Sequence, residues 1–268
     1  GLHECFVLPR GPDGDPGSGL RRAAGAGLRG LPRRAGPAGS ADPRGAAGAN
    51  CAGCGYPGCD GYAEGVVADG AKTNLCSVGG AEVAARIAEI MGVKAEKSVP
   101  MHAFLKCKGT PARSPRTVNY SGIQDCRSAA ILPGGSPNAC PFGCMGFGTC
   151  VKVCVFGALS IVDGLATVDT SKCVGCGTCV ATCPKSALML VPRAENVAVA
   201  CNSHWKGPTV KKVCSIGCIG CGLCAKVCPS NAITMDRDLA VIDPEKCTNC
   251  GTCVAKCPSK CINSVPAC

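Results

Sequence analysis

Apolar residues form two similar patterns along the chain, each made of two short runs separated by a turn. Residues 158–162 and 165–168 flank the dipeptide Asp163-Gly164, and residues 232–235 and 239–242 repeat the arrangement. Two apolar runs around Asp-Gly are typical of a β-hairpin with a type I′ turn. The sequence therefore predicts two hairpins, and their repetition predicts two copies of one structural unit.

A helical period is found nearer the start of the chain. Residues 81–91 place Val83, Ile87, Ile90 and Met91 on one helical face. Gly92 follows where glycine commonly ends a helix, because glycine adopts the left-handed conformation without strain. Short strands together with short helices predict the α+β class.

The composition argues against one large hydrophobic core. Aromatic residues make up 3% of the 268 residues, whereas 27 residues are cysteine. Metal–thiolate bonds hold together loops that bury too little apolar surface to fold alone. We therefore expect small modules organised around metal clusters.

Three cysteine sets share one spacing, Cys-x2-Cys-x2-Cys-x3-Cys followed by proline. They are Cys173, Cys176, Cys179 and Cys183; Cys218, Cys221, Cys224 and Cys228; and Cys247, Cys250, Cys253 and Cys257. This is the bacterial ferredoxin run for iron–sulfur clusters, in which three cysteines hold one cluster and the fourth reaches its neighbour. A fourth set is stretched and has Val155 in place of proline: Cys140, Cys144, Cys150 and Cys154. A fifth lies on a glycine-rich loop: Cys51, Cys54, Cys59 and Cys76.

The crossing rule distributes the four ferredoxin-type sets over four [4Fe–4S] clusters, and the fifth set holds one more. One dicluster module is expected to use Cys140, Cys144, Cys150 and Cys183 for one cluster and Cys173, Cys176, Cys179 and Cys154 for the other. The other module is expected to use Cys218, Cys221, Cys224 and Cys257, and Cys247, Cys250, Cys253 and Cys228.

Seven cysteines remain outside these sets: Cys5, Cys107, Cys126, Cys201, Cys214, Cys261 and Cys268. Four of them, Cys107, Cys126, Cys201 and Cys214, flank the first dicluster module in sequence and predict a sixth cluster. Four buried structural thiols are the alternative. The expected cofactors are therefore five or six [4Fe–4S] clusters.

Disulfides and zinc are the competing interpretations of the cysteines. Disulfide scaffolds are usually short and secreted, whereas this chain is long and has an odd number of cysteines. Zinc sites usually combine Cys-x2-Cys pairs from two separate places, and here three ligands fall within seven residues. A zinc knuckle remains an alternative for the fifth set.

The expected organisation has six parts. They are an Arg/Gly/Pro-rich, disordered or atypical segment 1–49, a four-cysteine helical [4Fe–4S] domain 50–98, a connector 99–139, a first dicluster ferredoxin-like module 140–192, an insertion 193–217 and a second such module 218–266. The first segment holds seven arginines and no lysine, and its composition cannot bury enough apolar surface to fold. A nucleic-acid-binding arm and a misread translation are the alternatives for it.

The formal charge of +10 counts each cysteine as neutral. A [4Fe–4S] cluster with four thiolates carries about −2 when oxidised, so five or six clusters offset most of this charge. The lysines near the cysteine sets, among them Lys152, Lys172, Lys185, Lys226, Lys246 and Lys256, either balance cluster charge or form a docking face for an acidic ferredoxin. We expect no nucleic-acid partner and no small-molecule substrate.

The motifs together resemble a known family. The run from Gly48 through Cys51, Cys54 and Cys59, followed by Cys76 and the ferredoxin repeats, resembles RnfB of the Rnf ion-translocating ferredoxin:NAD⁺ oxidoreductase complex, in its clostridia-like polyferredoxin form. The resemblance covers residues 48 to about 265 and takes in Lys106-Cys107-Lys-Gly, Asp125-Cys126-Arg and Cys201-Asn-Ser.

This resemblance implies an electron-transfer protein without a catalytic residue of its own. It would take electrons from reduced ferredoxin and contact other Rnf subunits at the cytoplasmic face of the membrane. Family members begin with a hydrophobic helix, and residues 1–47 contain no apolar run of about 20 residues, so we expect peripheral attachment. The alternatives are a soluble polyferredoxin serving a hydrogenase or another flavoenzyme, and a zinc-organised scaffold.

Overall fold

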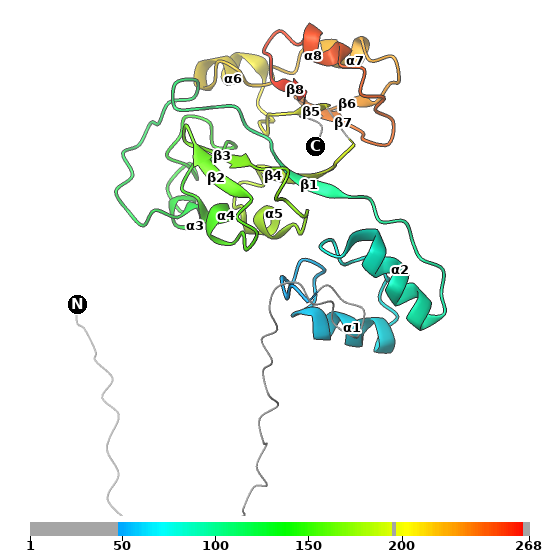
Figure 1. The fold of residues 1–268 in the computed structure, drawn as a ribbon. Helices are drawn as coiled ribbons and strands as arrows, with labels where there is room; N and C mark the ends of the chain where they lie inside the picture. The colour runs from blue at the N-terminus through cyan, green and yellow to red at the C-terminus, as the bar shows by residue number, and fades with distance from the viewer. Residues whose placement is uncertain (1–47, 195–196, 265–268) are drawn as a thin grey trace, which may run out of the picture. The chain divides into compact units, whose positions relative to one another are not determined.

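The computed structural model describes residues 48–194 and 197–264 (Figure 1). The segment 1–49 was expected to be disordered, and its residues 1–47 lie outside the described residues. Two of the cysteines that belong to no set, Cys5 and Cys268, also lie outside them. Within the described ranges, none of the helices has the length and apolar character needed to cross a membrane.

Two helices form the first part of the described chain. Helix α1 is Cys59–Ala68 and helix α2 is Gly80–Met91, which ends at Gly92 with φ 67° as predicted. Ile87 is buried against Tyr62 and Val66, but Ile90 is 63% exposed, contrary to the expected apolar face. The buried stripe of α2 runs through Ala84, Ile87 and Ala88 instead, because the short α1 covers only a narrow face.

Four two-stranded antiparallel sheets follow. They pair β1 (Met101–Leu105) with β4 (Leu188–Pro192), β2 (Leu159–Val162) with β3 (Leu165–Val168), β5 (Val197–Val199) with β8 (Ile262–Ser264), and β6 (Ile233–Asp236) with β7 (Leu239–Ile242). Asp163 and Gly164 both have positive φ, at 49° and 74°, so the β2–β3 turn has the backbone that type I′ requires. Both predicted hairpins are confirmed.

Strands β1 and β5 lie where a connector and an insertion were expected. Each pairs with the last strand of the ferredoxin-like repeat that follows it, β1 with β4 and β5 with β8. The expected starts at residues 140 and 218 therefore leave out an edge strand of each repeat. Local pattern does not reveal these strands, because their partners lie more than 60 residues away along the chain.

Four short helices follow a glycine in the left-handed conformation. The helices are α4 (Thr149–Lys152), α5 (Thr178–Thr182), α7 (Leu223–Lys226) and α8 (Thr252–Lys256), and the glycines are Gly148, Gly177, Gly222 and Gly251. In each helix the second residue is a cysteine. Helix α4 packs with α5, and α7 with α8 (Figure 1).

Two further helices lie in the segments that join the repeats. Helix α3 is Cys126–Ala129, and helix α6 is Gly207–Val213 with a proline in its first turn. Asp125 caps α3 by accepting hydrogen bonds from the backbone N–H groups of Arg127 and Ser128, at 2.8 and 3.2 Å.

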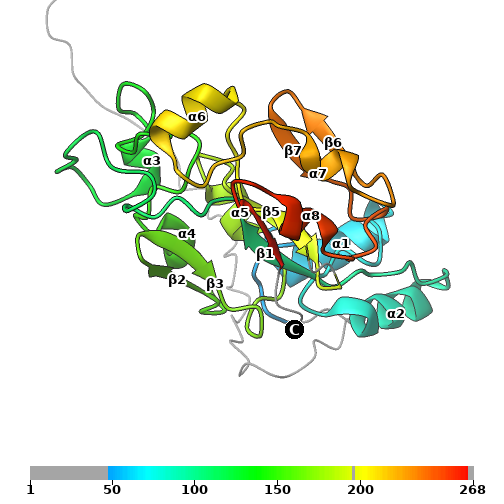
Figure 2. The same ribbon diagram turned by 90° about the horizontal axis from the view of Figure 1, so that it is seen from above.

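The two repeats share a small apolar core. Phe104 of β1 and Val191 of β4 pack with Ala198 of β5 and the adjacent Ala200. Figure 2 shows β1 and β5 beside each other. On either side of this contact, each repeat has its own buried cluster in which motif cysteines are members. The core thus joins the β1–β4 sheet of the first repeat to the segment around β5 of the second.

Candidate metal centres

Backbone N–H groups point at several motif sulfurs. Ala158 donates to the sulfur of Cys154 at 3.4 Å, and Ala232 donates to the sulfur of Cys228 at 3.3 Å. These two cysteines hold the same position in the two repeats. Hydrogen bonds to sulfur stabilise thiolates and orient metal ligands. Both sulfurs therefore have a donor that suits a thiolate, and every cysteine in the described ranges is free of a disulfide.

The N-terminal set is built on the α1–α2 pair. Cys76 is buried with Tyr62 and Ile87, and its sulfur accepts a hydrogen bond from Gly79 N–H at 3.4 Å. Burial raises the pKa of Cys51, as do the neighbouring Cys176 and Cys76, while the Gly53 N–H lowers it.

Gly53 explains why a cysteine of the first ferredoxin-like repeat is close to the N-terminal set. A Cβ at Gly53 would lie 2.7 Å from the Cβ of Cys176, so a side chain there would collide with that residue. Only glycine permits this approach. The loop that carries Cys51 and Cys54 is thereby held against the Cys173 set.

In each repeat, cysteines of both sets affect the pKa of a buried motif cysteine. Burial, followed by the charges of Cys173, Cys176 and Cys154, raises the pKa of Cys179 to about 11. In the second repeat, burial and the charges of Cys218, Cys221 and Cys257 raise the pKa of Cys224 to about 11. Cys154 and Cys257 therefore each lie near enough to the other set of their repeat to affect the pKa of one of its cysteines.

The first set has a different register from the one that its spacing suggested. Gly146, Gly175 and Gly220 all have positive φ, and a Cβ at each would collide with the backbone of a strand or hairpin turn. Each of these glycines lies two residues after a cysteine: Cys144, Cys173 and Cys218. Cys144 therefore corresponds to the first cysteine of the ferredoxin run, and Cys150, which follows Gly148, to the third.

In this register Phe147 occupies the place of the second cysteine, where Cys176 and Cys221 stand in other sets. Its ring packs 5.4 Å from that of Tyr120, and the Arg116 guanidinium lies 5.1 Å above it. Both neighbours come from the segment that precedes the set. The ferredoxin spacing of residues 144–154 is thus intact, with one ligand missing.

Cys126 lies near the set that lacks this ligand. Its N–H donates to the Thr149 hydroxyl at 2.7 Å, and the same hydroxyl donates to the Asp125 carboxylate at 2.7 Å. This network anchors α3 on α4. Cys126 lines one cavity with Cys144, Cys150 and Cys183.

Cys140 lines a second cavity together with Cys107, Cys201 and Cys214, and Cys144 lines both cavities. The cysteines that line each cavity therefore differ from the expected groups at two positions. Cys140 was expected with Cys150 and Cys183, and Cys126 was expected with Cys107, Cys201 and Cys214. The physical reason is that the network of Asp125 and Thr149 holds Cys126 on α4, while the turn after Cys140 directs the N–H groups of Phe142 and Gly143 to the Cys140 sulfur.

One signal in the sequence could have revealed the exchange. Cys144-x2-Phe147-x2-Cys150-x3-Cys154 has the spacing of the other three sets, whereas the spacing that starts from Cys140 differs from theirs.

Within the described ranges, no group of three or more His, Cys, Asp or Glu side chains is arranged to hold a single metal ion.

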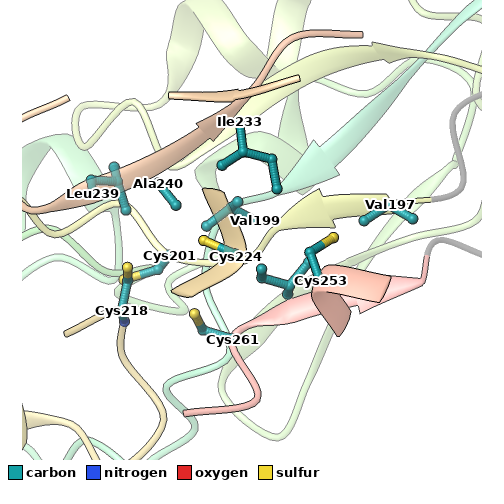
Figure 3. Packing of buried hydrophobic residues seen from close by; sticks show 11 residues of the cluster. Val197, Val199, Cys201, Cys218, Cys224, Ile233, Leu239, Ala240, Cys253 and Cys261 are labelled. Carbon is teal, nitrogen blue, oxygen red and sulfur yellow. The ribbon is translucent and has the colours of Figure 1, made fainter. Parts of the chain in front are cut away.

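Cys261 is a buried cysteine that belongs to no motif. Its sulfur lies 3.6 Å from that of Cys257, and its hydrogen bond to Cys218 lowers the pKa of Cys218. Figure 3 shows Cys218 beside both Cys261 and Cys201. Cys261 is therefore within hydrogen-bond distance of two motif sulfurs, and its single S–H can donate to one of them at a time.

Known families match three parts of the chain. A 4Fe-4S dicluster domain matches residues 217–261, a 4Fe-4S binding domain matches residues 166–189, and a family described as a putative Fe-S cluster matches residues 47–78. The chain therefore contains ferredoxin-type [4Fe–4S] domains within a mixed helix and strand fold.

Curated relatives match most of the chain. It is 48% identical over 81% of its length to the B subunit of the Na⁺-translocating ferredoxin:NAD⁺ oxidoreductase complex of Acetobacterium woodii. It is 49% identical over 74% of its length to the B subunit of the proton-translocating complex of Clostridium ljungdahlii. It is 46% identical over 75% of its length to the B subunit of the ion-translocating oxidoreductase complex of Methanosarcina acetivorans. The chain belongs to this RnfB family.

The chain spans 65%, 70% and 76% of these three relatives, respectively. Membership of the RnfB family confirms the resemblance inferred from the motifs, and it favours a component of an oxidoreductase complex over a soluble polyferredoxin. A solved formate dehydrogenase–heterodisulfide reductase–formylmethanofuran dehydrogenase complex from Methanospirillum hungatei matches 45% of this chain at 24% identity, with a TM-score of 0.17. That similarity is too weak to inform the fold.

Proposed function

We propose that this chain accepts electrons from reduced ferredoxin and conducts them through [4Fe–4S] clusters within a membrane ion-translocating ferredoxin:NAD⁺ oxidoreductase. The observation that carries the proposal is the series of cysteine sets, each with neighbours that suit a cluster, in a member of the RnfB family. Bound clusters would supply one-electron chemistry at low potential.

The proposed ligands are assigned from the neighbourhoods described above. Cys51, Cys54, Cys59 and Cys76 would hold the cluster of residues 50–98. Cys173, Cys176, Cys179 and Cys154 would hold one cluster of the first repeat. In the second repeat, Cys218, Cys221, Cys224 and Cys257 would hold one cluster, and Cys247, Cys250, Cys253 and Cys228 the other. The remaining sulfurs bring the number to five or six.

The second repeat is the more suitable place for contact with ferredoxin. Cys221 and Cys250 are the exposed cysteines in the described part of the chain. Lys226 and Lys256 end helices α7 and α8 close to them, and both side chains are exposed. An acidic electron donor would meet both positive charge and a short path to the sulfurs here.

We place the chain at the cytoplasmic face of the membrane, held by other subunits of the complex. The experiment uses anaerobically purified protein mixed with reduced ferredoxin. Bleaching of the cluster absorption at a rate that saturates with ferredoxin concentration is expected. A chain that is reduced by dithionite but not by ferredoxin would contradict the proposed donor.

Co-purification distinguishes the soluble alternative. A tagged chain expressed with the other subunits should be recovered from membranes with those subunits. Recovery of the chain alone in the soluble fraction, together with rapid exchange of electrons with a hydrogenase, would favour the polyferredoxin alternative.

A further inference from the structure

Glycines bring three sulfurs from separate segments close together. A Cβ at Gly109 would lie 3.7 Å from the sulfur of Cys107 and 3.6 Å from that of Cys214. A Cβ at Gly143 would lie 3.3 Å from the sulfur of Cys107 and 3.9 Å from that of Cys140. In each pair the sulfurs can be no farther apart than the two distances together. A [4Fe–4S] cubane holds its thiolate sulfurs about 6 to 7 Å apart.

Cys201 is the fourth cysteine of this group. It is 8% exposed and lines the same cavity as the other three. Burial raises the pKa of Cys201, and the charges of Cys218 and Cys140 raise it further. The N–H groups of Ser203 and Cys218 donate to its sulfur and lower its pKa.

Backbone N–H groups also donate to the sulfurs of Cys107 and Cys140. Cys107 accepts from Cys144 and Gly109, and Cys140 accepts from Phe142 and Gly143. Burial raises the pKa of Cys107 to about 12 despite these bonds. One buried and three half-buried cysteines, three of which accept backbone N–H hydrogen bonds at sulfur, suit an anionic ligand set better than ordinary apolar packing.

We propose that Cys107, Cys140, Cys201 and Cys214 hold a sixth [4Fe–4S] cluster, and that Cys126 replaces Cys140 as the fourth ligand beside Cys144, Cys150 and Cys183. This rests on the proposed function only in that the chain binds [4Fe–4S] clusters. With this exchange, every ferredoxin-type cluster has four cysteine ligands. Cys126 takes the place of the second cysteine of the run, the position at which the sequence has Phe147.

The sixth site lies between the clusters of the two repeats. Cys107 accepts a hydrogen bond from the backbone of Cys144, which belongs to the first repeat. Cys201 accepts one from the backbone of Cys218, which belongs to the second. Direct backbone contact with a ligand of each neighbour makes this site the link between the repeats.

Single substitutions distinguish the exchanged assignment from the one that sequence spacing suggests. Full-length protein, purified anaerobically, should contain about 24 irons, and Cys107→Ser, Cys140→Ser and Cys201→Ser should each lose about four. In a redox titration followed by EPR, these three variants should lose the same signal, and Cys126→Ser should lose a different one. If Cys140→Ser and Cys126→Ser lose the same signal, the proposal fails.

A rescue experiment tests the register directly. Phe147→Cys restores the ferredoxin spacing, so it should restore the lost iron in Cys126→Ser and leave Cys140→Ser deficient. Rescue of Cys140→Ser instead would overturn the assignment.

Two controls complete the test. Cys261→Ser should retain all iron, which shows that loss of a buried cysteine does not by itself unfold the chain. Stoichiometric zinc in protein lacking four irons would overturn the sixth cluster. Reduction by ferredoxin is measured separately, so a failed donor and a missing cluster give different results.

Discussion

The backbone N–H of Cys218 donates a hydrogen bond to the sulfur of Cys201 at 3.3 Å (Figure 3). Cys218 begins the motif of the second repeat, and Cys201 follows the edge strand β5 of the same repeat. Because Cys201 also lines one cavity with Cys140, this bond marks where the proposed metal centres of the two repeats meet. Contacts of this kind, between sulfurs and the groups around them, should control both the stability and the potentials of the clusters.

Lys185 lies near one cysteine of each of the two ligand sets in the proposed exchange. Burial lowers the pKa of Lys185, while the charges of Cys140 and Cys183 raise it. A positive charge stabilises the more negative, reduced form of a cluster, so Lys185→Met should lower two reduction potentials, each on the order of 50 mV. EPR-monitored titration measures both. Lys185→Arg, which keeps the charge, should shift neither strongly, and a shift at one cluster alone would contradict this placement.

Asp125 positions Cys126 through its cap and its bond with Thr149. Asp125→Ala should weaken α3 by about 1 kcal/mol and speed the loss of the Cys144 cluster to a chelator several-fold. Asp125→Asn retains a capping oxygen and should have a smaller effect. Asp243→Ala removes a similar side-chain bond in the second repeat, to Glu245 N–H, and should leave this cluster unaffected. Equal rates in Asp125→Ala and the unmodified protein would contradict the role.

Cys261 should tune a cluster without ligating it. Its thiol contacts Cys257 and Cys218, and hydrogen bonds to ligand sulfurs raise the reduction potential of a cluster. Cys261→Ala should retain full iron and lower one second-repeat potential, on the order of 50 mV. Cys261→Ser keeps a hydrogen-bond donor, so its reduction potential should lie between those of Cys261→Ala and the unmodified protein. Loss of four irons in Cys261→Ala would instead make Cys261 a ligand.

Lys226 and Lys256 should accelerate association with ferredoxin. Changing both to Glu should slow reduction by ferredoxin about tenfold at low salt and weaken its dependence on ionic strength, because steering by charge is screened by salt. Iron content should not change. The control is the double variant Lys94→Glu, Lys97→Glu. It makes the same change in net charge at two exposed residues of the N-terminal part. An equal slowing in both pairs would show that net charge, not a docking face, controls the rate.

Features that depend on neighbouring residues could be predicted from the amino-acid sequence. The Asp163-Gly164 hairpin formed as predicted because its turn needs only two residues that tolerate positive φ. Helix α2 ended at Gly92 for the same local reason. The repeated spacing around Cys173, Cys218 and Cys247 was sufficient to recognise ferredoxin-type domains, and the motif order was sufficient to recognise the RnfB family.

The grouping of cysteines around each cavity of the first repeat required the folded chain. Cysteine side chains are chemically alike, so a sequence offers spacing as the sole means of grouping them. Cys126 joins Cys144 because Asp125 and Thr149 anchor α3 on α4, and Cys107 meets Cys214 across Gly109 although more than a hundred residues separate them. Strands β1 and β5 were missed for the same reason. Their pairing depends on partners far along the chain, which local patterns do not specify.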